Sequence, residues 1–289
     1  MWGRGLGKEV SGSTVDERFG LRPVGVVRSP VSDAGAMPVN GVPASVEVYE
    51  AFAPALAEIA SNTHVWILAW LHGVTGEAPL QTRGRHARPG GAGRGVFGLR
   101  HAARPNPLGL TAARLLGVEE RVIHLDRLDF VDGTPVVDIK RYAPGWDAIF
   151  AARTYYETLP RDDAAAAIAA DLFLEAVHFH GEACVGAALA ARMLTHVMRA
   201  WGVAAKDPAL RVCVGADGCL ADGLQAVTGA TLGSGRLQVG HEASIRFTHG
   251  WQRVRLLPRR QLPLQADAVL AAPESALFGV QEEAVADTI

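Results

Sequence analysis

The sequence predicts a mixed fold, in which a small all-β barrel is followed by an α+β domain. The first half alternates short apolar runs with Gly- and Pro-rich turns, which is typical of the short strands of a barrel or sandwich. The second half is rich in alanine at helical spacing before it returns to short apolar runs. The 289 residues are 49% hydrophobic and 20% charged, which supplies core for about two domains.

The apolar runs of the first half predict strands joined by turns, with a single helical segment among them. A Rossmann arrangement is disfavoured, because the glycines at 90–95 lead into another apolar run and not into a helix. The expected strands are 24–27, 45–48, 65–71, 96–99, 110–117, 121–130 and 136–139. The expected helix is 49–60.

The pattern changes after Asp147, and a domain boundary is expected near 150–162. Asp162 or Asp163 is expected to cap a helix that runs to about Val177, followed by a helix at 184–201. A strand at 210–214, a helix at 221–227 and paired strands at 235–257 complete the second half. The predicted organisation is a loose leader at 1–20, the barrel at 21–150, a linker at 151–162, the α+β domain at 163–260 and a tail at 261–289.

Charge is unevenly distributed along the chain, although the net charge is only −2. The window 78–118 contains no acidic residue and carries +7, which leaves −9 for the rest of the chain. Arginines among glycines suit a loop that wraps an anionic ligand and neutralises phosphates, or else a solvated surface loop. The arginines of the window are Arg83, Arg85, Arg88, Arg94, Arg100, Arg104 and Arg114.

The sequence indicates a cytoplasmic protein without a membrane anchor. The first twenty residues lack the apolar run of a secretory signal. The most apolar region, 164–194, is interrupted by acidic residues and histidines that a membrane-spanning helix rarely tolerates. Cys184, Cys213 and Cys219 form no even set for disulfides and suit a reducing compartment.

Two Pro-rich strings stand out, at 104–109 and 132–135. The first reads Arg-Pro-Asn-Pro-Leu-Gly. Proline fixes φ and removes an amide donor, so this string predicts a rigid loop that presents Arg104 and Asn106. The second reads Asp-Gly-Thr-Pro, which taken alone predicts a tight turn.

The residues around these strings resemble the TrmO family, also called TsaA-like or YaeB. The matching strings are Gly-Val-Phe-Gly-Leu-Arg at 95–100, the Pro-rich string extended by Leu-Thr to 111, and Leu-Asp-Phe-Val-Asp-Gly-Thr-Pro-Val-Val-Asp-Ile-Lys-Arg-Tyr at 128–142. Gly-Val-Val-Arg-Ser-Pro at 25–30 and Thr-His-Val-Trp at 63–66 support them. The similarity covers about 22–147. It implies a β-barrel methyltransferase that uses S-adenosylmethionine.

The resemblance also implies an acceptor and a site. Family members methylate nitrogen in threonylcarbamoyl-adenosine beside the tRNA anticodon, as homodimers that hold the cofactor near their interface. The implied cofactor-binding residues are Phe97, Arg100, Arg104, Asn106, Leu108, Asp132, Thr134 and Asp138. Asn106 and Asp132 are the implied catalytic residues. Methyl transfer depends mainly on in-line positioning, and Asp132 either takes the proton lost by nitrogen or orients that nitrogen.

Several positions depart from the family pattern. Pro-Val-Asn at 38–40 stands where the family has Pro-Arg-Gln, and Arg-His-Ala at 100–102 replaces Arg-Ser-Pro. Lys-Arg-Tyr at 140–142 replaces Lys-Pro-Tyr, and the usual bacterial C-terminal extension is not evident. These departures leave a small-molecule acceptor as the alternative to tRNA.

The second half resembles the FmdE domain, named for a subunit of formylmethanofuran dehydrogenase. Phe-His-Gly-Glu-Ala-Cys-Val-Gly at 179–186, Asp-Gly-Cys-Leu-Ala-Asp-Gly-Leu-Gln at 217–225 and Thr-Gly-Ala-Thr-Leu-Gly at 228–233 carry the similarity, which covers about 163–257. That family pattern implies metal ligands, often for zinc. The implied ligands here are His180, Glu182, Cys184 and Cys219, with His178 in reserve.

Two departures mark this second motif, since Glu182 stands where the family has a histidine and Ala230 where it has a cysteine. The altered set either binds zinc or another metal, or is a relic of such a site. Three functions therefore follow from the sequence. They are a tRNA methyltransferase whose second domain positions RNA or dimerises, a methyltransferase for a small molecule or metal-bound ligand held by the FmdE-like domain, and a non-catalytic sensor of metal or adenosine.

Overall fold

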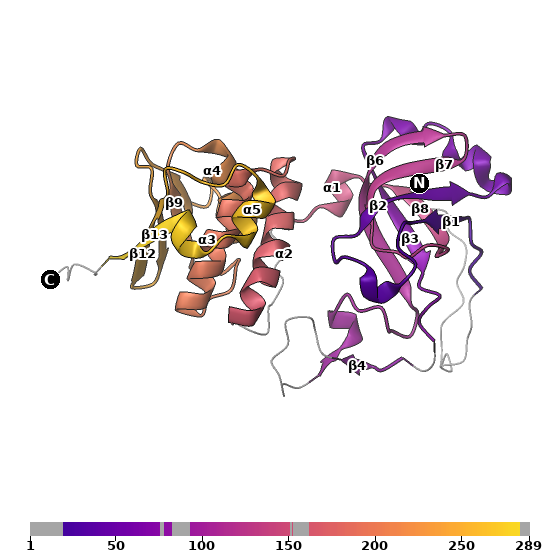
Figure 1. The fold of residues 1–289 in the computed structure, drawn as a ribbon, viewed down its shortest axis with the longest axis horizontal. Coiled ribbons are helices and arrows are strands. Elements are labelled where there is room, and N and C mark those ends of the chain that lie inside the picture. The colour runs from indigo at the N-terminus through magenta and orange to yellow at the C-terminus, as the bar shows by residue number, and fades with distance from the viewer. Residues whose placement is uncertain (1–19, 76–77, 83–92, 151, 153–161, 284–289) are drawn as a thin grey trace, which may run out of the picture. The chain divides into compact units, whose positions relative to one another are not determined.

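The computed structural model describes residues 20–75, 78–82, 93–150, 152 and 162–283. The chain divides into two compact units between Ala148 and Ile149 (Figure 1). The expected leader and most of the expected linker lie outside the described residues, as do Arg83, Arg85 and Arg88 of the basic window. No helix of the described segments has both the length and the apolarity needed to cross a membrane.

A closed barrel forms the N-terminal unit, as predicted (Figure 1). Its strands follow one another around the barrel in the order β1-β2-β7-β6-β3-β8. They are β1 (Gly25–Arg28), β2 (Val42–Val48), β3 (His64–Trp70), β6 (Leu108–Glu119), β7 (Val122–Leu128) and β8 (Pro135–Arg141). A short helix, α1 (Pro144–Asp147), ends this unit.

Alternation of side chains explains why these strands close around one core. In β3, Val65, Ile67 and Ala69 are fully buried inside the barrel, and the residues between them point outward. The β1–β2 contact depends on Gly25, because a Cβ there would lie 2.6 Å from the Glu47 carbonyl oxygen. The other buried residues come from every barrel strand and from Phe130.

Two local predictions in this unit were wrong. Residues 96–99, expected as a strand, form the 3-10 helix η4 (Val96–Gly98), which follows a two-residue pairing of β4 (Gln81–Thr82) with β5 (Arg94–Gly95). The expected helix at 49–60 consists of two 3-10 helices, η2 (Glu50–Leu56) and η3 (Ile59–Ser61). Pro54 lies inside η2, and Glu58 adopts a left-handed φ of 60° between the two, so no α-helix runs through. A fourth 3-10 helix, η1 (Ala34–Ala36), follows β1.

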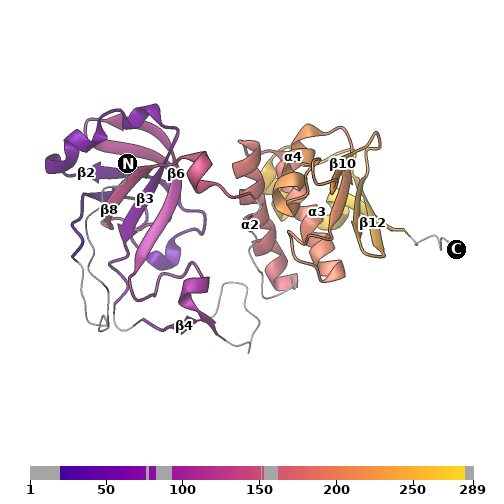
Figure 2. The ribbon, with the colours of Figure 1, turned by 180° about the vertical axis from the view of Figure 1, so that it is seen from behind.

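The C-terminal unit packs helices against a mixed sheet, as expected for an α+β domain. Figure 2 shows α2 (Asp162–His180), α3 (Val185–Trp201) and α4 (Gly218–Thr228) together on one side of the strands. The sheet order is β10-β9-β11-β12-β13, with β9 and β10 parallel and the other pairs antiparallel. These strands are β9 (Arg211–Val214), β10 (Leu237–Val239), β11 (Ile245–His249), β12 (Gln252–Pro258) and β13 (Phe278–Glu282).

The segment expected as a C-terminal tail is largely folded. It contains α5 (Ala266–Ala271), α6 (Glu274–Leu277) and β13, which pairs with β12. Val269, Leu277 and Phe278 are buried in the same core as α2, α3 and α4. The sequence signal was weak because α5 and α6 are short and have no side-chain cap at their N-termini.

Candidate functional site

The two Pro-rich strings meet at one rim of the barrel. The first string leads into β6, where Leu108 pairs with Trp70 and the Leu71 amide donates to the Pro107 carbonyl at 2.8 Å. The second string leads into β8, whose Val136 pairs with Ala69. Strand β3 therefore ends between the two strings and brings them to the same end of the barrel.

Phe130, two residues before the second string, contacts the last residue of the first string. Its ring is 3% exposed and lies against Gly109, the last residue of the first string. A Cβ at Gly109 would lie 3.0 Å from Phe130 Cζ and 2.9 Å from Leu71 Cδ2, and closer still to Phe130 Cε1. Beside this contact the Thr111 hydroxyl donates to the Asp129 carboxylate. Packing therefore requires glycine at this position in β6.

The second string folds as a turn that is tied to the end of β1. Asp132 Oδ1 accepts from the Ser29 amide at 3.0 Å, and Gly133, at φ +77°, donates its amide to the Val27 carbonyl at 3.0 Å. Thr134 is 1% exposed, and its hydroxyl donates to the Val131 carbonyl at 2.7 Å. The Asp132 carboxylate is therefore exposed, whereas the Thr134 hydroxyl is enclosed within the turn, where it is not accessible for the predicted contact with a ribose.

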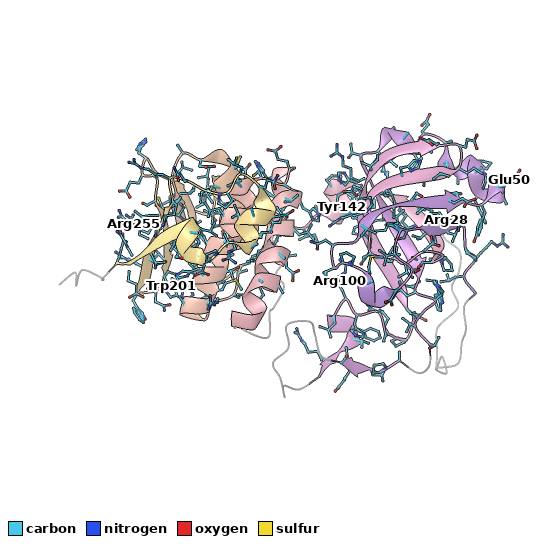
Figure 3. The ribbon with its side chains drawn as sticks, in the orientation of Figure 1. Arg28, Glu50, Arg100, Tyr142, Trp201 and Arg255 are labelled. Carbon is cyan, nitrogen blue, oxygen red and sulfur yellow. The ribbon has the colours of Figure 1, made fainter. Side chains whose placement is uncertain are left out.

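The first string places Asn106 and Leu108 at the rim. Two arginines donate hydrogen bonds to backbone carbonyls on either side of it. The side chain of Asn106 is exposed and makes no hydrogen bond to a described residue, and Leu108 is 38% exposed. The Arg100 guanidinium donates to the Leu110 carbonyl on β6 (Figure 3), and Arg104 Nη1 donates to the Leu99 carbonyl at 3.4 Å. Phe97 in η4 is 80% exposed.

Asp138 lies on the outer wall of the barrel, away from the turn that holds Asp132. It pairs across β8–β3 with Leu68, on the face opposite to the buried Ile67, and its carboxylate forms an ion pair with Lys140 at 2.6 Å. The structure therefore brings Asn106, Leu108 and Asp132 to one rim, and it places Asp138 farther along the outer face of the barrel, across Leu68 from Leu110.

Arg28 is a site neighbour that the sequence reasoning cited only as part of a supporting motif. It ends β1 beside Ser29, and its guanidinium contacts the Glu47 carboxylate at 2.7 and 3.0 Å (Figure 3). The hydrogen bond to Glu47 is the main cause of the raised pKa of Arg28, and the Asp132 charge adds to it. The Arg-Ser-Pro turn after the first strand was the signal that pointed to this position.

The C-terminal unit holds a compact group of potential metal ligands. One ring nitrogen of His180 and the sulfurs of Cys184 and Cys219 all lie within 4.8 Å of one another. His180 ends α2, Cys184 is the N-cap of α3, and Cys219 lies in the first turn of α4. Cys184 Sγ also accepts from the Ala187 amide at 3.4 Å. Three of the four predicted ligands are thus brought together.

The fourth predicted ligand, Glu182, lies outside this group. Its carboxylate is 73% exposed and 3.8 Å from His180 Nε2, beyond hydrogen-bond distance. Sequence reasoning did not select Asp222, whose Oδ2 lies 3.0 Å from His180 Nδ1. The charge of Cys184 is the main cause of the raised pKa of Cys219, and burial of the thiol adds to it. Ala230 is fully buried in the hydrophobic core.

Close approach of two helices assembles the cysteine pair. A Cβ at Gly186, near the start of α3, would lie 2.6 Å from Cys219 Cβ and 2.9 Å from the Leu220 amide nitrogen. One turn further along, a Cβ at Gly223 of α4 would lie 2.8 Å from Ala190 Cβ. Glycine at both positions lets α3 and α4 cross closely, and Cys219 is thereby held beside Cys184.

Comparison with known proteins identifies both halves of the chain. The family model described as the tRNA-methyltransferase O N-terminal domain matches residues 26–148. An S-adenosyl-L-methionine-binding protein of Archaeoglobus fulgidus is 33% identical over 134 residues, which cover 45% of this chain and 93% of that protein. The chain belongs to the TrmO family. A second family model, described as FmdE of the molybdenum formylmethanofuran dehydrogenase operon, matches residues 179–278.

Other members of the TrmO family share parts of this chain. A second Archaeoglobus fulgidus protein, named a probable S-adenosyl-L-methionine-binding protein, is 34% identical over 251 residues; the match covers 82% of this chain, and so runs through both units, but only 66% of that protein. The tRNA (adenine(37)-N6)-methyltransferase of Escherichia coli is 33% identical over 53% of this chain and 71% of that protein. A crystal structure of TrmO from Pseudomonas aeruginosa has 29% identity and a TM-score of 0.40, covering 51% of this chain and 63% of that chain.

Proposed function

We propose that this chain is an S-adenosylmethionine-dependent methyltransferase whose methyl-donor site is the barrel rim. The observation that carries the proposal is the meeting of the two Pro-rich strings, which sets the Asn106 amide, the Leu108 side chain and the Asp132 carboxylate at one end of the barrel. An exposed carboxylate, an unengaged amide and an apolar side chain suit a ligand that carries hydroxyls, an ammonium group and a sulfonium on an aliphatic chain. Family membership supports the same cofactor.

The acceptor that we propose is the N6 nitrogen of threonylcarbamoyl-adenosine beside the tRNA anticodon. Relatives named as tRNA (adenine(37)-N6)-methyltransferases support it, as does the basic window at 78–118 of the sequence. S-adenosylmethionine supplies an activated methyl group: an N–CH3 bond forms as the S–CH3 bond breaks, and the N6 proton leaves. Asn106 would orient the acceptor, and Asp132 would hold the nitrogen or take its proton, since the Ser29 amide occupies only Oδ1 of its carboxylate.

We also propose that the C-terminal unit binds a divalent metal, with zinc as the best match to its donors. One imidazole nitrogen and two thiolates are the ligand types that zinc prefers, and three protein ligands leave a fourth position for water or another ligand. His180 Nε2 is buried without a hydrogen-bond partner, which is what a donor facing a metal would show. The proposed ligands are His180, Cys184 and Cys219.

The proposed assembly is a homodimer in the cytoplasm. Leu108 and Leu110 expose 38% and 43% of their surface on neighbouring outward positions of β6, next to the rim, where a second copy would cover them. The cysteines carry no disulfide, and a tRNA acceptor places the reaction in the same reducing compartment. Light scattering of the purified chain tests the dimer, and a mass equal to one chain, 30.6 kDa, would refute it.

The decisive experiment incubates the full chain with methyl-labelled S-adenosylmethionine and either tRNA that carries threonylcarbamoyl-adenosine or a metabolite extract. Label in the tRNA nucleoside supports the proposed acceptor. Label only in the metabolite fraction would replace tRNA by a small molecule, and cofactor binding without any transfer would mark a sensor. Elemental analysis of the same preparation tests the metal: zinc at about one per chain, lost in a Cys184→Ala variant, is the expected result.

A further inference from the structure

The His180 imidazole has two nitrogens in different surroundings. Nδ1 lies 3.0 Å from Asp222 Oδ2, within hydrogen-bond distance. Nε2 is buried and has no hydrogen-bond partner among the described residues; its nearest carboxylate, from the exposed Glu182, is 3.8 Å away. The same ring contributes one nitrogen to the group formed with Cys184 and Cys219.

These surroundings determine which nitrogen carries the proton. A neutral imidazole has one N–H and one lone pair, and an ionised carboxylate can only accept a hydrogen bond. The proton therefore belongs on Nδ1, which donates to Asp222, and the lone pair belongs on Nε2. A buried nitrogen lone pair without a partner is costly, so Nε2 is the atom that gains most from a ligand.

We infer that Asp222 is the positioning residue of the metal centre, which fixes His180 as an Nε2 donor. The inference rests on the proposed metal binding. Asp222 follows Cys219 by three residues on α4, so the two side chains share a helix face. One helix thus supplies a sulfur ligand and the carboxylate that orients the histidine ligand from α2. Carboxylates that accept from a ligating histidine strengthen it as a donor and hold its ring in place.

The test compares zinc affinity of the full chain and three variants by competition with a chelator. Asp222→Ala is expected to weaken binding roughly 10- to 100-fold, because the ring loses its orientation. Asp222→Asn is expected to lose less zinc affinity than Asp222→Ala, because its amide oxygen still accepts a hydrogen bond from Nδ1–H. Asp267→Asn is the matched control: it removes a carboxylate that lines the same surface hollow as Cys184, with no contact to His180. Equal affinities of Asp222→Ala and the native chain would overturn the inference.

A second readout needs no metal. In the metal-free chain labelled with nitrogen-15 at histidine, long-range proton–nitrogen spectra report the tautomer of each ring, and a His180→Gln variant identifies the His180 signals. The native chain is expected to show the Nδ1–H tautomer, and Asp222→Ala is expected to move the population toward Nε2–H. An Nε2–H tautomer in the native chain would refute the role of Asp222. If the native chain binds no metal, the metal centre and the role of Asp222 in it both fail, whereas a native chain that binds zinc but shows the Nε2–H tautomer refutes the role of Asp222 alone.

Discussion

Gly109→Ala tests whether the two Pro-rich strings form one structural unit. The added methyl would lie 2.9 Å from Leu71 Cδ2 and 3.0 Å from Phe130 Cζ, well inside ordinary contact distance. Leu71 can move, but the Phe130 ring is 3% exposed and packed in the barrel core. Overpacking of this kind costs about 1–3 kcal/mol. For a barrel of this size the melting temperature falls by roughly 3–5 °C for each kcal/mol.

The same substitution is expected to weaken cofactor binding, because Phe130 lies two residues before Asp132 and a displaced ring moves the turn. Gly117→Ala is the control, since it adds a methyl on the same strand where no heavy atom lies within 4 Å. The assays are thermal unfolding and calorimetric titration with S-adenosylmethionine. In the double variant with Phe130→Leu, the smaller side chain is expected to restore about 1 kcal/mol of the loss. The reasoning is refuted if Gly109→Ala melts and binds cofactor like Gly117→Ala.

Three further predictions concern the metal group, a partly buried ion pair and the basic window. Gly186→Ala should weaken zinc binding at least about 10-fold, because the added methyl pushes Cys219 away from Cys184. Gly218→Ala is the control, since it lies beside Cys219 with open space around it and should leave the zinc affinity unchanged. Equal zinc affinities of the two variants would contradict this prediction. The hydrogen bond with His196 lowers the pKa of Glu274, so its stabilising effect is present above the unfolded pKa near 4.5 and disappears as the pH falls through the lower folded value. Between pH 7 and 3, the free energy of unfolding in urea should therefore fall by about 1 kcal/mol less in Glu274→Gln than in the native chain. The same fall in both chains would disprove this prediction. Changing Arg83, Arg85 and Arg88 to Gln should reduce the slope of log binding constant against log salt concentration for tRNA by roughly 2. An unchanged slope would show that these arginines do not contact tRNA.

Local signals in the sequence were sufficient for most elements of both units. Period-two alternation in β3 and helical spacing in α3 depend on neighbours in the chain, so they could be read without the structure. The helix expected at 49–60 failed for a local reason, the proline at position 54, whereas other failures depended on distant partners. Residues 96–98 follow a pairing of β4 with β5 that is only two residues long, and they form a 3-10 helix where the sequence predicted a strand. Strand β13 forms because β12 offers an edge, which the sequence of β13 does not reveal.

For the candidate sites too, residues in local motifs were visible in the sequence, whereas contacts between distant residues were not. The strings that carry Asn106 and Asp132 were visible in the sequence, but the contact of Gly109 with Phe130 joins residues 21 positions apart and needs the closed barrel. Thr134 was selected from the family resemblance, which does not report that its hydroxyl is buried in the turn. Asp222 was missed because the predicted helix, 221–227, began after Cys219, whereas α4 begins at Gly218 and places both residues on one face.

The central claim is that the barrel rim transfers a methyl group to tRNA, and one measurement tests it most directly. The native chain and a folded Asn106→Ala variant are incubated with methyl-labelled S-adenosylmethionine and tRNA that carries threonylcarbamoyl-adenosine, and the labelled nucleosides are separated. Asn106 is exposed and makes no hydrogen bond to a described residue, so its replacement should leave stability within about 0.5 kcal/mol. The account predicts label at N6 with the native chain and at least about a 100-fold slower reaction with the variant. Equal labelling by both chains, or no label in tRNA with the native chain, would contradict it.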